Sequence, residues 1–179
     1  MSEFDIYGEA MASLRAGSLA IVGNGRMGRA LTAALADAAG PFGRGFDGDG
    51  FDAVLLAVPD REIVAAASLI RPGRLVGHCA GAWGLDLLDP HEAFAVHPLM
   101  TVTSAGAEFA GAGAAVAGST PRAEAFARGL AERLGMEAFT IADADRAAYH
   151  AAASIASNFL VTLEDAAEAV LRTAGADRR

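Results

Sequence analysis

The amino-acid sequence predicts an α/β fold in which a mostly parallel sheet carries helices on both faces. Short apolar segments alternate with helical patterns over residues 18–142, the order that parallel strands joined by crossover helices require. The segment Asp52–Val58 is apolar almost throughout, which is typical of a parallel strand buried on both faces. Near the start of this region, glycines follow an apolar segment and precede a helical pattern, which predicts a strand, a tight turn and a helix. A ligand of such a fold binds at the carboxyl ends of the strands.

The chain is long enough for one domain with a substantial core. It has 179 residues, of which 53% are hydrophobic and 20% are charged, close to the composition of an average globular domain. We divide it into an N-terminal extension (1–17), an α/β domain (18–142) and a C-terminal helix (143–179) that is the first part of a helical, dimerising domain.

Each expected element has a local reason. Apolar segments predict the strands, and glycine or proline ends several of the helical patterns. Ser119 or Thr120 is placed to cap one helix, which has Pro121 in its first turn and runs to about Leu134. The other helices are expected over Arg26–Ala39 and Asp60–Ile70, and the strands over Ser18–Gly23, Asp52–Val58, Arg74–Cys79, Ala93–Val96, Gly113–Ala117 and Met136–Ile141.

The segment Asp143–Thr173 predicts one long helix, because it contains neither glycine nor proline. Its apolar face has no partner within the expected α/β domain. Either a further domain or the same helix of a second subunit must cover this face, so we expect a homodimer formed through the C-terminal helix.

The charged residues exclude several chemistries. All 14 basic residues are arginine, so a lysine Schiff base and a phosphate-binding lysine of the P-loop type are impossible. The net charge of −8 would repel nucleic acid. The segment Met1–Gly17 lacks the apolar stretch of a signal peptide, and we expect a cytoplasmic protein.

Neither a membrane span nor a metal site is expected. Ala147–Leu163 carries no formal charge but is short for a span and contains several polar residues. The histidines and the single cysteine, Cys79, lack the spacing of a metal site. Cys79 is expected to be a small buried apolar residue.

A glycine motif, G-x-G-x-x-G, lies between the first strand and the first helix. Gly23 allows the tight turn, Gly25 lets the backbone approach a pyrophosphate, and Gly28 permits close packing of the helix. The N–H groups at the start of the helix would face the anion. A turn that binds no ligand is the alternative. The cofactor-binding candidates here are Gly23, Asn24, Gly25, Arg26, Met27 and Gly28.

The residue that would read the adenosine ribose is expected after the second strand. The candidates are Arg44 and, slightly later, Asp47 or Asp49. Arg44 favours NADP, because a guanidinium pairs with the 2′-phosphate. A solvated loop arginine is the alternative. Only seven residues separate Arg44 from Asp52, too few for the usual crossover helix, so the second crossover should be abbreviated.

Two further strand ends supply candidates. Ala57, Val58 and Pro59 close the central strand, where their backbone could contact a nicotinamide ribose. Asp60 could instead simply cap the next helix. His97 ends a later strand, and either a substrate contact or a structural hydrogen bond would explain it.

The C-terminal helix carries a polar stripe. His150, Ser154 and Asn158 are four residues apart and share one helix face, which is costly to bury unless something polar faces it. We expect this stripe to face the cofactor cleft near Gly23–Gly28 and Val58. Polar packing against the sheet or a partner helix is the alternative.

The motifs G-N-G-R-M-G, A-V-P-D, G-H-C-A-G-A, V-H-P-L and Y-H-A-A-A-S-I-A-S-N together resemble an uncharacterised Rossmann-like family. This family is related to ketopantoate reductase, pyrroline-5-carboxylate reductase and the 6-phosphogluconate dehydrogenase-like superfamily. Several relatives carry a lysine as proton donor four residues before an asparagine that holds substrate and nicotinamide. Asn158 matches that asparagine, whereas Ser154 stands where the lysine would be. His150, with an ordinary pKa near 6.5, is the better candidate for proton transfer.

Two functions fit these observations. The first is an NADP-dependent reductase of a small oxo- or imino-acid, with NAD as the other cofactor that would fit. The proton would come from His150 or from a water held by Ser154, and the catalytic candidates are His150, Ser154, Asn158 and His97. The second is a non-catalytic nucleotide-binding or assembly module that has lost the lysine.

Overall fold

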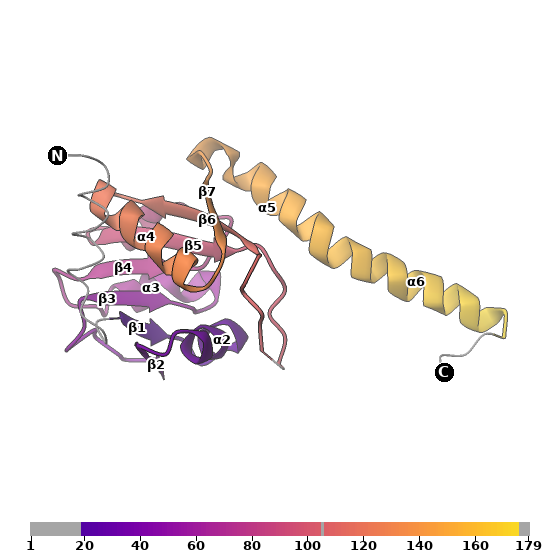
Figure 1. Ribbon diagram of the computed structural model, residues 1–179, viewed down its shortest axis with the longest axis horizontal. Coiled ribbons are helices and arrows are strands. Elements are labelled where there is room, and N and C mark those ends of the chain that lie inside the picture. The colour runs from indigo at the N-terminus through magenta and orange to yellow at the C-terminus, as the bar shows by residue number, and fades with distance from the viewer. Residues whose placement is uncertain (1–18, 105, 176–179) are drawn as a thin grey trace.

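The computed structural model describes residues 19–104 and 106–175, and the N-terminal extension lies outside the described residues. The described chain forms a seven-stranded sheet in the order β2-β1-β3-β4-β5-β6-β7, which confirms the predicted α/β fold (Figure 1). The strands are β1 (Leu19–Val22), β2 (Ala38–Phe42), β3 (Ala53–Leu56), β4 (Leu75–His78), β5 (Glu92–Pro98), β6 (Gly113–Gly118) and β7 (Glu137–Thr140).

The strand directions show at which edge of the sheet a ligand would bind. Strands β1 to β5 are parallel to their neighbours, β6 is antiparallel to β5, and β7 is parallel to β6. The carboxyl ends of β1, β3, β4 and β5 therefore lie along one edge, where an open α/β sheet binds its ligand.

Helices follow most of the strands, largely as predicted. Thr120 caps α4, because its hydroxyl accepts a hydrogen bond from the Ala123 N–H at 3.1 Å. Asp60, by contrast, is not an N-cap residue, because η1 begins after Pro59 and α3 begins after Glu62, and neither of these two residues makes a side-chain cap. The helices are α2 (Arg26–Ala34), α3 (Ile63–Ala67) after a 3₁₀ turn η1 (Asp60–Glu62), α4 (Pro121–Arg133), α5 (Arg146–Ser154) and α6 (Leu160–Thr173), with further 3₁₀ turns η2 (Leu85–Leu88) and η3 (Asp143–Asp145).

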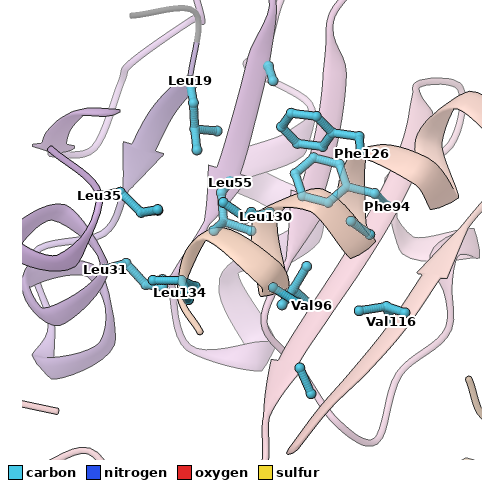
Figure 2. Close-up of a cluster of buried hydrophobic side chains, with 14 of the residues drawn as sticks. Leu19, Leu31, Leu35, Leu55, Phe94, Val96, Val116, Phe126, Leu130 and Leu134 are labelled. Atoms are coloured by element: carbon cyan, nitrogen blue, oxygen red, sulfur yellow. The ribbon is translucent and has the colours of Figure 1, made fainter. Parts of the chain in front are cut away.

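Alternating side chains of the buried strands divide the core into two layers. Leu19 and Ile21 of β1 face α2 and α4, while Ala20 and Val22 face α3. Figure 2 shows the first layer, in which leucines of α2 and α4 meet the strands and the ring of Phe94 lies against Phe126. Both faces of the central strands are thus covered, as their continuous apolar sequence requires.

The first helix is shorter than predicted. It ends at Ala34 rather than Ala39, and residues 38–42 form β2 beside β1. Gly40 adopts a φ of +135°, and a Cβ there would lie 2.5 Å from the Ile21 carbonyl oxygen. Pairing with β1 at this close distance overrides the helical preference of the alanines.

The crossover from β2 to β3 is abbreviated, as the spacing predicted. Residues 43–52 contain no helix, and an aromatic cluster of Phe42, Phe46 and Phe51 occupies this end of the sheet. The rings of Phe42 and Phe46 stack with centroids 4.1 Å apart, and Phe51 meets both edge-on. These rings bury apolar surface that a crossover helix would otherwise cover.

The predicted C-terminal helix is nearly continuous and extends away from the sheet (Figure 1). A π-helical segment η4 (Ile155–Phe159) joins α5 to α6. The exposed apolar side chains of this region are more than half accessible, and they are Ile155, Phe159, Leu160, Val161, Leu163, Val170 and Leu171. Within residues 19–104 and 106–175, no helix is both long and apolar enough to cross a membrane.

We predict that Phe94→Ala lowers the free energy of unfolding by about 3–5 kcal/mol, the usual loss for a buried phenylalanine. Phe94 is fully buried, and its ring centroid lies 4.8 Å from that of Phe126. Urea unfolding would measure the loss. Val64→Ala, at a side chain that is 56% exposed, is the control and should change stability by less than about 0.5 kcal/mol. Equal losses in the two variants would contradict this placement of the core.

Candidate functional site

The glycine turn after β1 lies very close to neighbouring backbone segments. Gly23 has a φ of +119°, and a Cβ on it would lie 2.3 Å from the Ala57 carbonyl oxygen. A Cβ on Gly28 would lie 1.8 Å from the Gly23 carbonyl oxygen, so α2 can reach the turn only if this residue is glycine. Gly25, in contrast, has no atom within 4 Å of its Cβ position. The turn is therefore closed on its protein side and open on its outer side.

The start of α2 is left free for an anion. Gly25 is its N-cap residue and makes no side-chain cap, and the first turn contains no acidic residue. Arg26 is exposed at the first position of the helix. Uncapped N–H groups and the positive end of the helix dipole favour a phosphate at this point.

A first cavity of about 600 Å³ adjoins the glycine turn. Its lining residues come from the turn, the end of β3, the loop after β2, and the segment from η1 through α3 to Leu69. Of the cofactor-binding candidates, seven line this cavity, namely Gly23, Asn24, Gly25, Arg44, Ala57, Val58 and Pro59.

The three other candidates do not line the first cavity. Gly28 packs beneath the turn, Met27 packs against the core, and Arg26 is exposed. Asn24 lines the cavity and its Oδ1 accepts a hydrogen bond from Nε of Arg29 at 2.8 Å, which fixes the side chain.

Arg44 is paired with an acidic residue that the sequence did not indicate. Its Nη2 lies 3.2 and 3.4 Å from the two carboxylate oxygens of Glu62, which also lines the first cavity. The Arg44 side chain is 89% exposed, so this ion pair contributes little to stability. Glu62 lies 18 residues further along the chain, and no local motif connects the two residues.

A second cavity, also of about 600 Å³, lies between the end of β5 and α5. His97, His150 and Ser154, which were predicted as catalytic candidates, all line it. The polar stripe thus lies at this second cavity, and neither histidine nor the serine lines the first one. The side chain of the fourth candidate, Asn158, lies outside the described part of the structure.

His97 is held in place from several sides. Its Nδ1 lies 2.7 Å from the hydroxyl oxygen of Tyr149, and the two rings meet edge-on with centroids 5.5 Å apart. Phe139 of β7 packs against Tyr149 in turn. A Cβ on Gly81, in the loop after β4, would lie 2.7–2.9 Å from three atoms of the His97 ring. The imidazole therefore fills the space that a side chain at Gly81 would need.

Burial lowers the pKa of His97 to about 4, and the nearby His150 acts in the same direction. His78 and Arg146 lower it further, while the carboxylate of Asp60 opposes them. His97 is therefore neutral near pH 7. Burial also raises the pKa of Tyr149, which keeps its hydroxyl protonated.

The remaining histidines and the cysteine have structural contacts. Nδ1 of His78 accepts a hydrogen bond from the Ala80 N–H at 3.2 Å, and its Nε2 lies 3.0 Å from the Gly84 carbonyl oxygen. His91 contacts the Ala67 carbonyl oxygen in the same way. Cys79 packs against the core, and desolvation raises the pKa of its thiol to about 12. Among the described residues, no group of three potential metal ligands comes together.

Known proteins share this fold. A family model described as a domain of unknown function (DUF2520) matches residues 112–179, and no curated protein matches the chain. A solved protein from Thermotoga maritima is similar, with a TM-score of 0.73 and 22% identity over 89% of this chain and 71% of that one.

Two named enzymes are also similar in structure. A pyrroline carboxylate reductase of Plasmodium falciparum, solved with NADP bound, has a TM-score of 0.65 and 13% identity over 89% of this chain and 71% of its own. An NADH-preferring ketol-acid reductoisomerase from an uncultured archaeon has a TM-score of 0.70 and 17% identity over 93% of this chain and 64% of its own. At these identities the likeness shows the fold alone, and it confirms the Rossmann-like fold that the resemblance implied.

We predict that alanine has unequal effects on stability at two glycines of the turn. Gly28→Ala should lower the melting temperature by several degrees, because its Cβ meets the Gly23 backbone at 1.8 Å. Gly25→Ala should leave the melting temperature within about 1–2 °C of the parent, because its Cβ position is open. Thermal unfolding followed by circular dichroism would compare them. A tolerated Gly28→Ala would contradict the close contact between α2 and the turn.

Proposed function

We propose that this protein is a reductase that uses NADPH to reduce a small oxo- or imino-acid. The observation that carries the proposal is the pair of cavities at the carboxyl ends of the parallel strands. The first combines an open glycine turn with Arg44, and the second brings together His97, His150 and Ser154. Each has a volume within the usual range for a small-molecule site.

The residues of the first cavity fit a dinucleotide. The open Cβ position of Gly25 leaves room for a pyrophosphate against the uncapped start of α2. Phe46, Ala65 and Leu69 offer apolar surface for an adenine ring. Arg44 would bind the 2′-phosphate of NADPH, since a guanidinium forms strong hydrogen bonds with phosphate. The NADP bound in the similar Plasmodium falciparum enzyme supports this assignment.

The second cavity would hold the substrate. When bound, NADPH supplies a hydride, which goes to the carbon of the C=O or C=N group of the substrate. The oxygen or nitrogen of that group then takes up one proton, which balances the reduction. His150 is exposed to the cavity and would donate this proton, and a water held by the Ser154 hydroxyl is the alternative donor.

A non-catalytic nucleotide-binding module is the second candidate, favoured by one observation. Ser154 occupies the position at which relatives carry a lysine, and the chain has no lysine elsewhere to replace it. Such a module would bind NADPH without oxidising it in the presence of oxo- or imino-acids. Turnover assays with a panel of small acids of these two classes would separate the candidates.

We predict that NADPH binds more tightly than NADH. Arg44→Ala should remove this preference by weakening NADPH binding roughly tenfold to a hundredfold, the usual effect of losing one charged hydrogen bond. Glu62→Gln should strengthen NADPH binding, because it removes a negative charge that competes for Arg44. Energy transfer to the nicotinamide from Trp83, the only tryptophan, would report binding.

Arg61→Ala is the matched control for this titration. Arg61 also lies near Glu62, at 3.9 Å, but it does not line the first cavity. Its replacement should leave both affinities unchanged. Equal affinities of the parent protein for NADPH and NADH, or a preference that survives Arg44→Ala, would contradict the role of Arg44.

We predict that His150 is the source of the pH dependence of reductase activity, because its imidazole would donate the proton in the second cavity. His150→Ala should lower the activity by about a hundredfold or more and remove this pH dependence. Asn158→Ala, in contrast, should impair substrate or nicotinamide placement and keep the pH dependence. A pH–rate profile that is unchanged in His150→Ala would exclude His150 as the donor.

We also propose that the protein is a homodimer in which the apolar side chains of α6 contact a second copy. Left uncovered, Leu163, Val170 and their neighbours would form a large apolar patch in water. We predict a dimer by light scattering at micromolar concentration, and Leu163→Glu should shift it toward monomer. A parent protein that is monomeric over this range would contradict the proposal.

A further inference from the structure

The hydrogen bond between His97 and Tyr149 has a direction that the chemistry of the two groups decides. A phenol is a good donor, and the unprotonated nitrogen of a neutral imidazole is a good acceptor. His97 is neutral near pH 7, and Tyr149 keeps its proton. These protonation states favour a hydrogen bond in which the Tyr149 hydroxyl donates to Nδ1 of His97 across 2.7 Å. A neutral imidazole that accepts at Nδ1 carries its proton on Nε2.

The Nε2 atom of His97 is free to meet a ligand. Among the described residues it has no hydrogen-bond partner, whereas every buried side-chain nitrogen and oxygen of that part of the chain has one. Nε2 is therefore accessible, and His97 lines the second cavity. The imidazole offers one N–H donor whose position is set by the hydrogen bond on its other side.

Several groups surround the His97 ring. Tyr149, His150 and Arg146 face it from α5, His78 from β4, and Asp60 from the turn after β3. Gly81 leaves room for the ring on the β4 side, and Phe139 backs Tyr149 on the β7 side. The Tyr149 hydrogen bond and the close contact with Gly81 leave the ring little freedom to flip or rotate.

We propose that Tyr149 is a positioning residue, which holds His97 as its Nε2–H tautomer so that this neutral imidazole donates a hydrogen bond to an acceptor oxygen of the substrate. The substrate contact rests on the proposed reductase function, whereas the tautomer does not. The two histidines of the second cavity then have separate tasks: His97 orients and polarises the substrate, and His150 supplies the proton. A neutral imidazole can stabilise a developing negative charge on oxygen without transferring its own proton.

The tautomer can be observed directly in the full-length, ¹⁵N-labelled protein at pH 7 by ¹H–¹⁵N correlation of the imidazole nitrogens. His78 and His91 are internal references, because each faces a backbone carbonyl oxygen with Nε2 and must therefore carry its proton there. His97→Gln identifies the signals of His97. We expect the Nε2–H pattern for His97 in the parent protein. The Nδ1–H pattern would overturn the proposal.

Two variants test whether the hydrogen bond from Tyr149 determines the tautomer of His97. Tyr149→Phe removes only the hydroxyl and should turn His97 into a mixture of both neutral tautomers, with His78 and His91 unchanged. Gly81→Ala should do the same, because its Cβ would lie within 2.9 Å of the imidazole and displace it from Tyr149. Thr101→Val removes a hydroxyl from the same cavity and is the control that should leave His97 as Nε2–H. A His97 signal that does not respond to Tyr149→Phe would overturn the proposal.

Kinetic measurements distinguish the positioning role of Tyr149 from the proposed reductase function. With any substrate that the protein reduces, Tyr149→Phe should lower kcat about tenfold, the value of one well-placed hydrogen bond. It should leave NADPH affinity unchanged, because Tyr149 does not line the first cavity. If the tautomer responds as expected and no substrate is reduced, the positioning role stands and the reductase fails. If a substrate is reduced but Tyr149→Phe does not change the His97 tautomer, the reductase function is supported and the positioning role of Tyr149 is contradicted.

Discussion

The contact between α2 and the turn after β1 sets the geometry on which the first cavity depends. Gly28 lies so close to the Gly23 carbonyl that no side chain fits between them, and Gly23 itself is pressed against the backbone of Ala57. This contact fixes where α2 begins and directs its N-terminus toward the sheet edge. The helix end, the glycine turn and the end of β3 then form one rigid surface, and a flexible loop could not hold them in this arrangement.

The second cavity depends on topology rather than on a motif. His97 lies near the end of β5, beside the loop that carries Gly81, and the chain returns through β6, α4 and β7 before α5 reaches the same place. Tyr149 therefore meets His97 across 52 residues of sequence. Because the strands that precede both cavities are parallel neighbours, their carboxyl ends bring the two cavities to one edge of the sheet. A hydride donor in the first and an acceptor in the second would suit that arrangement.

Local sequence patterns predicted much of the fold. The glycine motif, the buried strand β3 and the Thr120 cap each depend on a few neighbouring residues, and the structure confirms them. A second strand was expected before Arg44, but its bounds were not predicted, because the sequence of β2, A-A-G-P-F, has no alternating pattern and only its pairing with β1 makes it a strand. Capping a helix was one interpretation of Asp60, but Asp60 is not at an N-cap position, and its charge opposes the lowering of the His97 pKa by burial.

Only part of the candidate site could be predicted from the sequence, because many of its contacts join residues that are distant in the chain. Arg44, His97 and His150 stand out by residue type and position, but the partners that determine what they can do are distant in sequence. Glu62 reaches Arg44 and Tyr149 reaches His97 only after folding. Tyr149 directly precedes His150 in the motif that carried the resemblance, yet nothing in that motif shows that its hydroxyl meets a strand end. Such pairs follow from the packing of several elements.

The central claim is that the edge of the sheet binds NADPH across the glycine turn and presents its nicotinamide toward the second cavity. A crystal structure of the protein with NADPH tests this most directly. We predict the pyrophosphate at Gly25 and the start of α2, the 2′-phosphate on Arg44 with the Glu62 contact broken, and the nicotinamide on the side of His97. A pyrophosphate bound away from the glycine turn, or a first cavity that stays empty at saturating NADPH, would contradict it.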